Sequence, residues 1–313
     1  MKKPINVVFM GTPDFAVPCL EALHDYGCRV SLVVTRPDQP KGRGRKIIAP
    51  PVKTAAAALG YPILQPSSVK TDEFYDIIKA IAPDLLVVVA FGHVLPKRIL
   101  EIPAWGAINV HASLLPKYRG PAPIQWAIIN GDDHTGVTTM LMDKGLDTGE
   151  ILLTAQTDIR PDDTSQTLHD QLAFDGAELI KKTLAGMENG FIRPTPQNHA
   201  LATYAPMLKK QDGHIDWSLS AGKIECLIRG MTPWPGAFTF RDNKQIKIFK
   251  VLPKPLISHA HPGTVIEGFS NELRVACGDG ALSIIEIQGS SGRRMHISDF
   301  LRGAAIPAGT VFT

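Results

Sequence analysis

Short apolar segments alternate with segments of helical composition along the first part of the chain. The apolar segments are rich in Val, Ile and Leu and lie at residues 5–10, 30–35 and 85–90. Such continuous apolar runs are typical of strands that are covered on both faces of a sheet. The segments of helical composition lie between them, at residues 18–26, 51–59 and 71–81. This order predicts an α/β domain with a doubly wound, mostly parallel, Rossmann-like sheet.

The next part of the chain predicts an antiparallel edge to this sheet. Strand patterns at residues 107–110, 136–142 and 151–159 are closely spaced, and a Gly-rich turn at 144–150 separates the last two. Strands joined by so short a connection pair in antiparallel fashion. Residues 164–187 then predict a long helix, because Thr164 is a suitable N-cap and apolar residues recur near helical spacing.

A change of composition marks the end of the first domain. Residues 189–206 are rich in proline and polar residues without periodicity, which is typical of a linker. After a helical segment at 221–229, alternating runs separated by glycine and asparagine turns predict a small antiparallel, OB-like β-barrel, at residues 236–240, 246–251, 263–267, 273–276 and 282–288. For a chain of 313 residues we therefore expect an α/β domain at 1–189, a linker at 190–207 and a β-barrel domain at 208–313.

The composition is that of a globular protein. Hydrophobic residues make up 44% of the chain and charged residues 20%, so a sizeable core can form. No apolar run approaches the ~20 residues that span a bilayer, and the start of the chain lacks the apolar segment of a signal peptide. We therefore expect a cytoplasmic protein that does not bind membranes. The four cysteines are scattered without a C-x-x-C pair, which favours free thiols over a metal site.

The net charge of +3 is small, but basic residues cluster in the sequence KGRGRK at 41–46. Lys41, Arg43, Arg45 and Lys46 are separated there by glycines that leave the backbone free to adapt. Taken alone, this pattern favours a solvated surface loop.

An amide and an imidazole lie two residues apart where the strand at 107–110 leads into the sequence HASLLPKYRG. In an open α/β sheet, ligands bind beyond the carboxyl ends of the strands. Strand alternation directs the side chains of Asn109 and His111 to the same side, with Val110 facing the core. In most proteins such a pair would be structural. The apolar, proline-stiffened loop that follows favours a ligand site here.

The turn GLDTG at 145–149 follows the next strand, and we expect it to bring Asp147 close to His111. An aspartate flanked by glycines more often stabilises its own turn. An amide, an imidazole and a carboxylate from neighbouring strands nevertheless form a coherent set for acyl transfer. The amide donates to a developing oxyanion, the imidazole moves a proton, and the carboxylate orients the imidazole or accepts a proton through water.

The sequence offers no protein nucleophile beside these residues. It has no G-x-S-x-G elbow, and no cysteine lies near them. Direct transfer between two bound substrates is therefore favoured over a covalent intermediate. The sequence GTPD at 11–14 retains only one glycine of a dinucleotide fingerprint and has Pro13 at a glycine position, which opposes a nucleotide-dependent oxidoreductase.

These motifs resemble those of the methionyl-tRNA formyltransferases. The resemblance extends over essentially the whole chain, through FMGTPDFAVPCLEAL, RPDQPKGRGRK, VVVAFGHVLP, INVHASLLPKYRGPAPIQWAI, TGVTTMLMDKGLDTGEIL, IDWS and MTPWPGAF. It implies that the first domain transfers a formyl group from 10-formyltetrahydrofolate to the amino group of initiator methionyl-tRNA. It also implies that no metal takes part and that the second domain binds tRNA. We expect the protein to be a monomer.

The resemblance also implies roles for particular residues. Asn109, His111 and Asp147 are expected to be catalytic. The co-substrate is expected to contact two groups of residues, a loop of Ser113, Leu114, Leu115 and Pro116, and a pterin site of Val88, Ala90, Phe91, Gly92, Met140 and Asp143. Lys41, Arg43, Arg45 and Lys46 are expected to contact tRNA, with Arg43 near the first base pair of the acceptor stem. Ala112 stands where many relatives have a glycine.

One alternative shares the catalytic residues. A formyltransferase of the same superfamily acts on a small amine, such as glycinamide ribonucleotide or an amino-sugar nucleotide. The basic loop and the second domain favour tRNA as the acceptor, because both add contacts that a small amine does not need.

Overall fold

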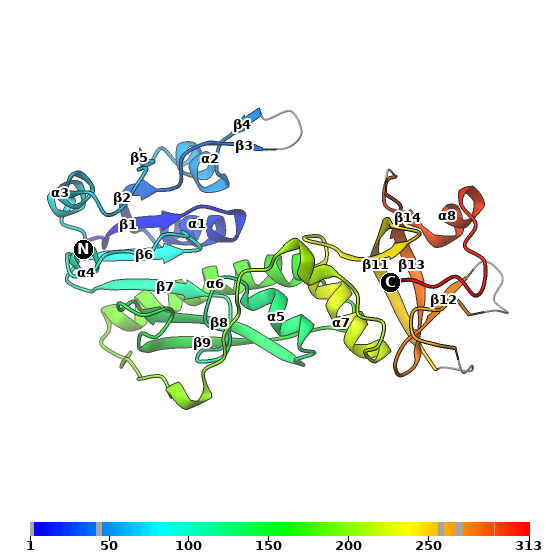
Figure 1. Cartoon of the computed structure of the whole chain (residues 1–313). Helices are drawn as coiled ribbons and strands as arrows, with labels where there is room; N and C mark the ends of the chain where they lie inside the picture. Colours follow the sequence, from blue (N-terminus) through cyan, green and yellow to red (C-terminus); the bar gives the residue numbers. More distant parts are fainter. Residues whose placement is uncertain (1–2, 42–45, 256–259, 267–271, 291) are drawn as a thin grey trace. The chain divides into compact units, whose positions relative to one another are not determined.

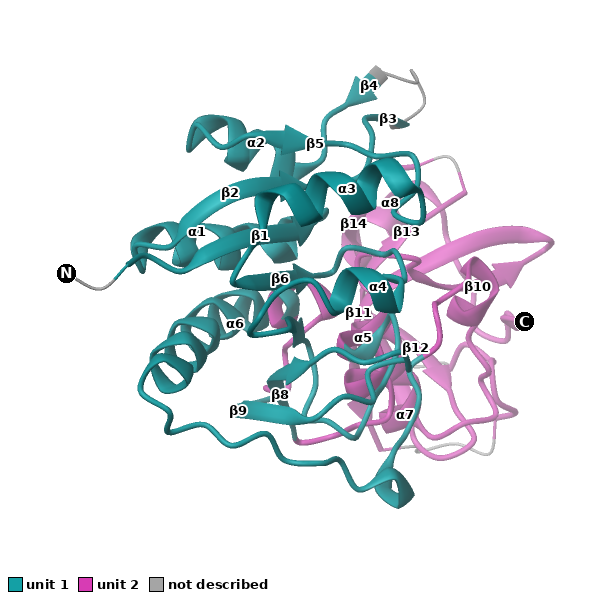
Figure 2. Ribbon diagram, turned by 90° about the vertical axis from the view of Figure 1, so that its left-hand side faces the viewer, with its two compact units in different colours: residues 1–123, 134–158, 169–205 teal, residues 124–133, 159–168, 206–313 magenta. Residues whose placement is uncertain are grey.

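The structure of the chain is a computed structural model that describes residues 3–41, 46–255, 260–266, 272–290 and 292–313 (Figure 1). The chain forms two compact units, which are coloured separately in Figure 2. Unit 1 consists of residues 1–123, 134–158 and 169–205, and unit 2 consists of residues 124–133, 159–168 and 206–313.

Unit 1 is built on a seven-stranded sheet with the strand order β5-β2-β1-β6-β7-β8-β9. The strands are β1 (Asn6–Gly11), β2 (Arg29–Val34), β5 (Ile63–Leu64), β6 (Leu85–Val89), β7 (Ala107–His111), β8 (His134–Leu141) and β9 (Ile151–Asp158). The strands from β5 to β7 are parallel, whereas β8 is antiparallel to β7 and β9 is antiparallel to β8. The predicted doubly wound sheet with an antiparallel edge is therefore confirmed.

Helices cover both faces of this sheet. On one face, α3 (Asp72–Ile81) and α4 (Lys97–Leu100) contribute Phe74, Ile78 and Ile99 to a core cluster that includes Val8 and Val88. On the other face, α6 (Ser165–Glu188) places Gly176 so close to Val110 of β7 that a Cβ atom there would lie 3.0 Å from the valine side chain. All five residues of β6 are buried, which explains the continuous apolar run in the sequence.

The other helices are shorter than α6, and α7 is the longest of them. They are α1 (Val17–Asp25), α2 (Pro51–Ala58), α5 (Pro123–Ile129), α7 (Ala221–Met231) and α8 (Ile297–Gly303), with 3₁₀ turns at Asp14–Ala16, His199–Leu201 and Lys210–Gly213. Thr164 precedes α6, and its hydroxyl accepts a hydrogen bond of 3.3 Å from the backbone N–H of Thr167, as expected of an N-cap. Among the described residues, none of the helices combines the length and the apolar character needed to cross a bilayer.

Unit 2 contains an antiparallel half-barrel. Its strands are β10 (Ala237–Arg241), β11 (Lys244–Lys254), β12 (Leu273–Ala276), β13 (Ala281–Gln288) and β14 (Met295–His296). They pair in the order β10-β11-β13-β12, and β14 also pairs with β13. The strand predicted at 263–267 is present only as isolated bridges of Thr264 and Val265, and residue 267 lies outside the described ranges. The class of the second domain is as predicted.

The segment at 190–205, which the sequence indicates to be part of a linker, is packed into unit 1. Thr195 bridges to Ile151, and Tyr204 bridges to Arg119. Such backbone contacts can hold a segment that has no helix or strand periodicity, so the sequence pattern does not predict them. The domain boundaries at 189 and 208 stay predictions.

Candidate active site

Asn109 and His111 occupy alternate positions at the end of β7, as the strand pattern predicts. Asn109 pairs with Val88 of β6 on one side and with Met140 of β8 on the other, so these three residues form a row across the sheet. Val110 faces α6, which leaves Asn109 and His111 on the opposite face of the sheet. The Asn109 side chain is half-buried, and within the described part of the chain its carboxamide has no hydrogen-bond partner. It is therefore free to bind a ligand.

His111 is buried, with 6% of its surface exposed. Its Nε2 atom lies 2.9 Å from the carbonyl oxygen of Tyr118. Because a carbonyl only accepts hydrogen bonds, Nε2 carries a proton and donates it. The other ring nitrogen, Nδ1, lies 3.8 Å from Oδ2 of Asp147, which is beyond hydrogen-bonding distance but within reach of an ion pair. The Tyr118 carbonyl therefore fixes the ring, and Nδ1 is the nitrogen left for chemistry.

Asp147 reaches His111 even though β8 runs antiparallel to β7. The end of β8, at Leu141, pairs with Ile108 near the start of β7, about 10 Å from His111 at ~3.3 Å per residue. The turn after β8 therefore folds back along the sheet. The backbone N–H of Gly120 donates a hydrogen bond of 2.8 Å to Oδ2 of Asp147. This bond fixes the carboxylate beside the imidazole.

Asp143 stabilises the same turn from within. Its Oδ1 atom accepts hydrogen bonds from the N–H of Gly145 at 2.8 Å and from the hydroxyl of Thr148 at 2.7 Å. The other residue predicted for the pterin site in this region, Met140, is buried.

The loop predicted to contact the co-substrate is held by hydrogen bonds on both sides. The Ser113 hydroxyl donates to the carbonyl of Lys117 at 2.6 Å, and the Thr138 hydroxyl donates to the carbonyl of Ser113 at 2.6 Å. Ser113 and Leu115 are buried, whereas Leu114 and Pro116 are half-buried. Leu114 and Pro116 are therefore the members of this loop whose side chains still offer surface to a ligand.

The segment at 88–92 leaves β6 in an unusual backbone conformation. Ala90 has φ 45° and Gly92 has φ 75°, both in the left-handed region, while Val88 and Phe91 are buried. The guanidinium of Arg36 donates a hydrogen bond to the carbonyl of Gly92. Burial, together with the charge of Arg36, lowers the pKa of the neighbouring His93.

Left-handed backbone occurs in three of the segments around these residues. Among the described non-glycine residues with positive φ are Ala90 at 45°, Tyr118 at 59° and Asp147 at 53°. Left-handed backbone is uncommon for such residues and is found preferentially at functional sites. These three residues lie in the segment after β6, in the loop after β7 and in the turn after β8, which all carry residues predicted for the site.

The basic sequence at 41–46 lies between two short strands, β3 (Gln39–Lys41) and β4 (Lys46–Ile48). Arg43 and Arg45 lie outside the described residues, and the side chains of Lys41 and Lys46 are not described either. The residues that precede the hairpin are held by side chains of α2 and of the segment after β5: Lys53 donates to Asp38 at 2.7 Å, and Gln65 donates to the carbonyl of Arg36 at 2.7 Å.

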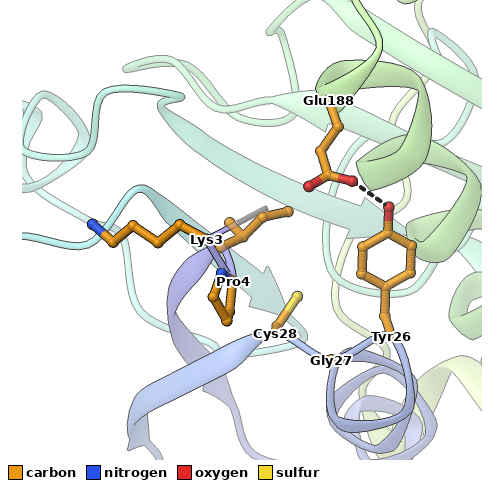
Figure 3. Close-up of a pocket in the computed structure, with 7 residues that line it drawn as sticks. Lys3, Pro4, Tyr26, Gly27, Cys28 and Glu188 are labelled. Carbon is orange, nitrogen blue, oxygen red and sulfur yellow. Dashed lines mark hydrogen bonds between the residues drawn. The ribbon is translucent and has the colours of Figure 1, made fainter. Parts of the chain in front are cut away.

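A cavity of 290 Å³ lies elsewhere in unit 1, where the chain enters β1 and β2 (Figure 3). Tyr26 and Glu188 form a hydrogen bond of 2.8 Å there, and burial, with Glu188 as a second cause, raises the pKa of Tyr26 to about 12. Burial also raises the pKa of the Cys28 thiol to about 12. The cavity is at the amino end of β1, whereas Asn109 and His111 are at the carboxyl end of the parallel strand β7. It is therefore separate from the candidate active site.

Comparison with known proteins decides the family. Residues 4–184 match the formyl transferase family, and residues 207–305 match the formyl transferase C-terminal domain. The methionyl-tRNA formyltransferase of Geotalea uraniireducens is 50% identical over 307 residues, which cover 98% of this chain and 97% of the relative. That of Desulforamulus reducens is 51% identical over 308 residues, with the same coverage of 98% and 97%. The chain belongs to the methionyl-tRNA formyltransferases.

Solved structures with the same fold are more distant in sequence. An N-formyltransferase from Helicobacter canadensis, solved with folinic acid and dTDP-3-aminofucose, has a TM-score of 0.68 at 20% identity and covers 91% of this chain and 99% of its own. HypX from Aquifex aeolicus, solved with tetrahydrofolic acid, has a TM-score of 0.64 at 17% identity and covers 96% of this chain. This chain spans about half the length of HypX, 47%. The family and the fold that the sequence motifs indicate are both confirmed for this methionyl-tRNA formyltransferase.

Proposed function

We propose that this methionyl-tRNA formyltransferase moves the formyl group of 10-formyltetrahydrofolate to initiator methionyl-tRNA by direct attack of the aminoacyl amine, with Asn109, His111 and Asp147 as catalytic residues. A bond forms between the amine nitrogen and the formyl carbon, and the bond between that carbon and N10 of the folate breaks. The proton lost by the amine balances the proton that N10 gains.

The free carboxamide of Asn109 is the observation that supports this proposal most. The carboxamide is half-buried and is not engaged by any described residue, so a ligand that enters the site can bind it without breaking an internal hydrogen bond. Asn109 donates to the formyl oxygen as negative charge grows there. One such donor contributes about 3–4 kcal/mol to transition-state stabilisation.

His111 supplies the movable proton. Since Nε2 is committed to the Tyr118 carbonyl at 2.9 Å, we assign proton transfer and oxyanion stabilisation to Nδ1. Asp147, whose Oδ2 lies 3.8 Å from Nδ1, stabilises the charged ring and accepts the amine proton through water. The Gly120 N–H holds the carboxylate in place while the charge on the ring changes.

The residues at the end of β6 and in the 113–116 loop would hold the co-substrate. The exposed residues Ala90 and Gly92, the half-buried Asn109, and the exposed parts of Leu114 and Pro116 suit a flat ring with polar edges, while Val88 and Met140 are buried and support Asn109 from either side. Formyl transfer is the chemistry that the bound folate supplies there. The Ser113 side chain stabilises the loop through its own hydrogen bonds, so Ser113 would offer the co-substrate its backbone rather than its side chain.

The basic loop would hold the tRNA. Lys41, Arg43, Arg45 and Lys46 give it four positive charges, which bind phosphates without reading sequence. Lysines on β11 in unit 2 would add phosphate contacts, although Lys247 already donates to the carbonyl of Pro235 at 3.0 Å. We further propose that the enzyme acts as a monomer in the cytoplasm, which size-exclusion chromatography with light scattering and cell fractionation would test.

Formylation of charged initiator tRNA in the presence of 10-formyltetrahydrofolate tests the proposal directly. We expect turnover with methionyl-tRNA and none with glycinamide ribonucleotide or an amino-sugar nucleotide at the same concentration. Turnover of a small amine without turnover of methionyl-tRNA would contradict the assignment of the acceptor. 5-Formyltetrahydrofolate as an unreactive isomer controls for contaminating formyl donors.

A further inference from the structure

We propose that Gln197 and Arg119 are a pair of positioning residues that hold the turn of Asp147 in its catalytic geometry. This inference rests on the role proposed above for Asp147. Gln197 lies in the segment after α6 that the sequence indicates to be a linker, and the structure places it in unit 1 beside the active site.

The side-chain amide of Gln197 forms hydrogen bonds with both its donor and its acceptor group, to the turn of Asp147 and to Arg119. Its Nε2 atom donates to the carbonyl of Asp147 at 2.9 Å and to the carbonyl of Gly149 at 2.7 Å. Its Oε1 atom accepts from Nε of Arg119 at 3.2 Å and from a terminal guanidinium nitrogen at 2.7 Å. Arginine only donates and carbonyls only accept, so the orientation of the amide follows from its partners.

This contact is buried and charge-assisted. Gln197 is 6% exposed and Arg119 is 2% exposed. The Arg119 guanidinium also donates to Nδ1 of His199 at 3.0 Å, so both side chains that accept its hydrogen bonds are neutral. A buried charge strengthens the hydrogen bonds that satisfy it, and removal of the Gln197 oxygen would leave guanidinium N–H groups of Arg119 without an acceptor.

Backbone hydrogen bonds also connect the loop of Arg119 with the segment that follows Gln197. The N–H of Arg119 donates to the carbonyl of Thr203 at 2.9 Å, and the N–H of Ala205 donates to the carbonyl of Arg119 at 2.8 Å. Arg119 follows Tyr118, whose carbonyl binds His111, and precedes Gly120, whose N–H binds Asp147. One short loop thus contacts the imidazole, the carboxylate and the Gln197 amide.

Asp147 is consequently held at both ends. Gly120 binds its carboxylate, and Gln197 binds its backbone carbonyl. The residue has φ 53°, in the left-handed region that aspartate adopts more readily than most residues, and these two contacts fix it in that geometry. A displacement of about 1 Å at a reacting group costs on the order of 10²-fold in rate. We therefore expect loss of the Gln197 donors to lower kcat rather than substrate binding.

Gln197→Glu tests this most sharply. The new carboxylate keeps the size of the side chain and an acceptor for Arg119, but it has no donor for the carbonyls of Asp147 and Gly149. We expect kcat for methionyl-tRNA formylation to fall at least about 10-fold, with both KM values within about 3-fold of wild type. Gln156→Glu, the same change at an exposed position of β9, is the matched control and should leave kcat and KM unchanged.

A double-mutant cycle with Asp147→Asn separates positioning from general stabilisation. If Gln197 acts through Asp147, Gln197→Glu should lower the residual kcat of Asp147→Asn by less than about 2-fold, because coupled residues are not additive. Equal effects in both backgrounds would overturn the proposal, and so would wild-type kcat in a folded Gln197→Glu enzyme. If instead Asp147→Asn alone retains full activity, the proposed role of Asp147 fails, which is a separate result.

Gln197→Met covers the case in which the added charge prevents folding. Methionine preserves length and volume and removes both the donors and the acceptor, so the same fall in kcat is expected. Thermal unfolding and circular dichroism identify the folded variants. If neither variant folds, Gln197 is required for the structure of unit 1 as a whole, and the positioning role is rejected.

Discussion

Oδ2 of Asp147 lies 3.8 Å from Nδ1 of His111 and at the same time accepts a hydrogen bond of 2.8 Å from the N–H of Gly120. The carboxylate is thus fixed by the backbone and faces the imidazole across a gap wider than a hydrogen bond. In the mechanism proposed above, Nδ1 exchanges a proton beside this carboxylate. We expect different consequences when the carboxylate of Asp147 and the carboxamide of Asn109 are removed.

Asp147→Asn removes the negative charge and keeps an oxygen for the Gly120 N–H. We expect kcat for formyl transfer to fall at least about 10²-fold with intact folding, because the protonated imidazole loses its counter-charge. Steady-state kinetics with methionyl-tRNA measure the effect. Asp76→Asn on the exposed side of α3 is the control, and equal activities of the two variants would remove Asp147 from the mechanism.

Asn109→Ala removes the free carboxamide from the row between Val88 and Met140. Loss of one oxyanion donor should lower kcat by about 10²–10³-fold, which corresponds to about 3–4 kcal/mol. The thermal midpoint should change little, because the amide has no partner among the described residues that would be left unsatisfied. Asn189→Ala, at the end of α6, should keep wild-type kcat. A large loss of stability with normal kcat would show that Asn109 is structural.

Gly120→Ala should destabilise unit 1. Gly120 has φ 118°, and a Cβ atom there would lie 2.8 Å from the carbonyl oxygen of Ala205. We expect the free energy of unfolding to fall by about 3 kcal/mol, together with activity, since the Gly120 N–H also binds Asp147. Gly190→Ala shares a positive φ, 68°, but has open space around it, so about 1 kcal/mol is expected there. Urea titrations compare the two variants.

Asp38→Asn should change the acid stability of unit 1. Hydrogen bonds from Lys53 and then Gln65 lower the pKa of Asp38. The contribution of a carboxylate with a lowered pKa is present above its unfolded value of about 3.9 and disappears as the pH falls through the folded value. Wild type should therefore be more stable than Asp38→Asn at neutral pH, and the difference should shrink below about pH 4. A pH-independent difference in urea midpoints would contradict this assignment.

Arg43→Ala should weaken tRNA binding more than folate binding. One lost phosphate contact reduces the slope of log Kd against log salt by about 1. Arg43 lies outside the described residues, so this prediction depends on the sequence alone. Filter binding at several salt concentrations measures the slope, and Lys182→Ala on α6 controls for the loss of one positive charge. An unchanged slope with a raised KM for folate would reject the tRNA role.

The sequence by itself determined the alternation of strands and helices, the antiparallel edge of the first sheet, and the presence of Asn109 and His111 on one side of β7. These features follow from local periodicity, which the backbone geometry of a strand or helix imposes on neighbouring residues. The motifs HASLLPKYRG and GLDTG also identified the family correctly.

Only the tertiary structure decided how these residues work together. The sequence led us to expect Asp147 close to His111, and the structure shows the route: β8 is antiparallel to β7, and the turn after β8 folds back to His111. The Tyr118 carbonyl, the Gly120 N–H and the Gln197 amide have no signature in the sequence, because backbone groups are the same in every residue and Gln197 is a polar residue in a segment without periodicity. Their roles arise from contacts between positions up to 78 residues apart, such as Arg119 and Gln197, which packing creates and local pattern does not record.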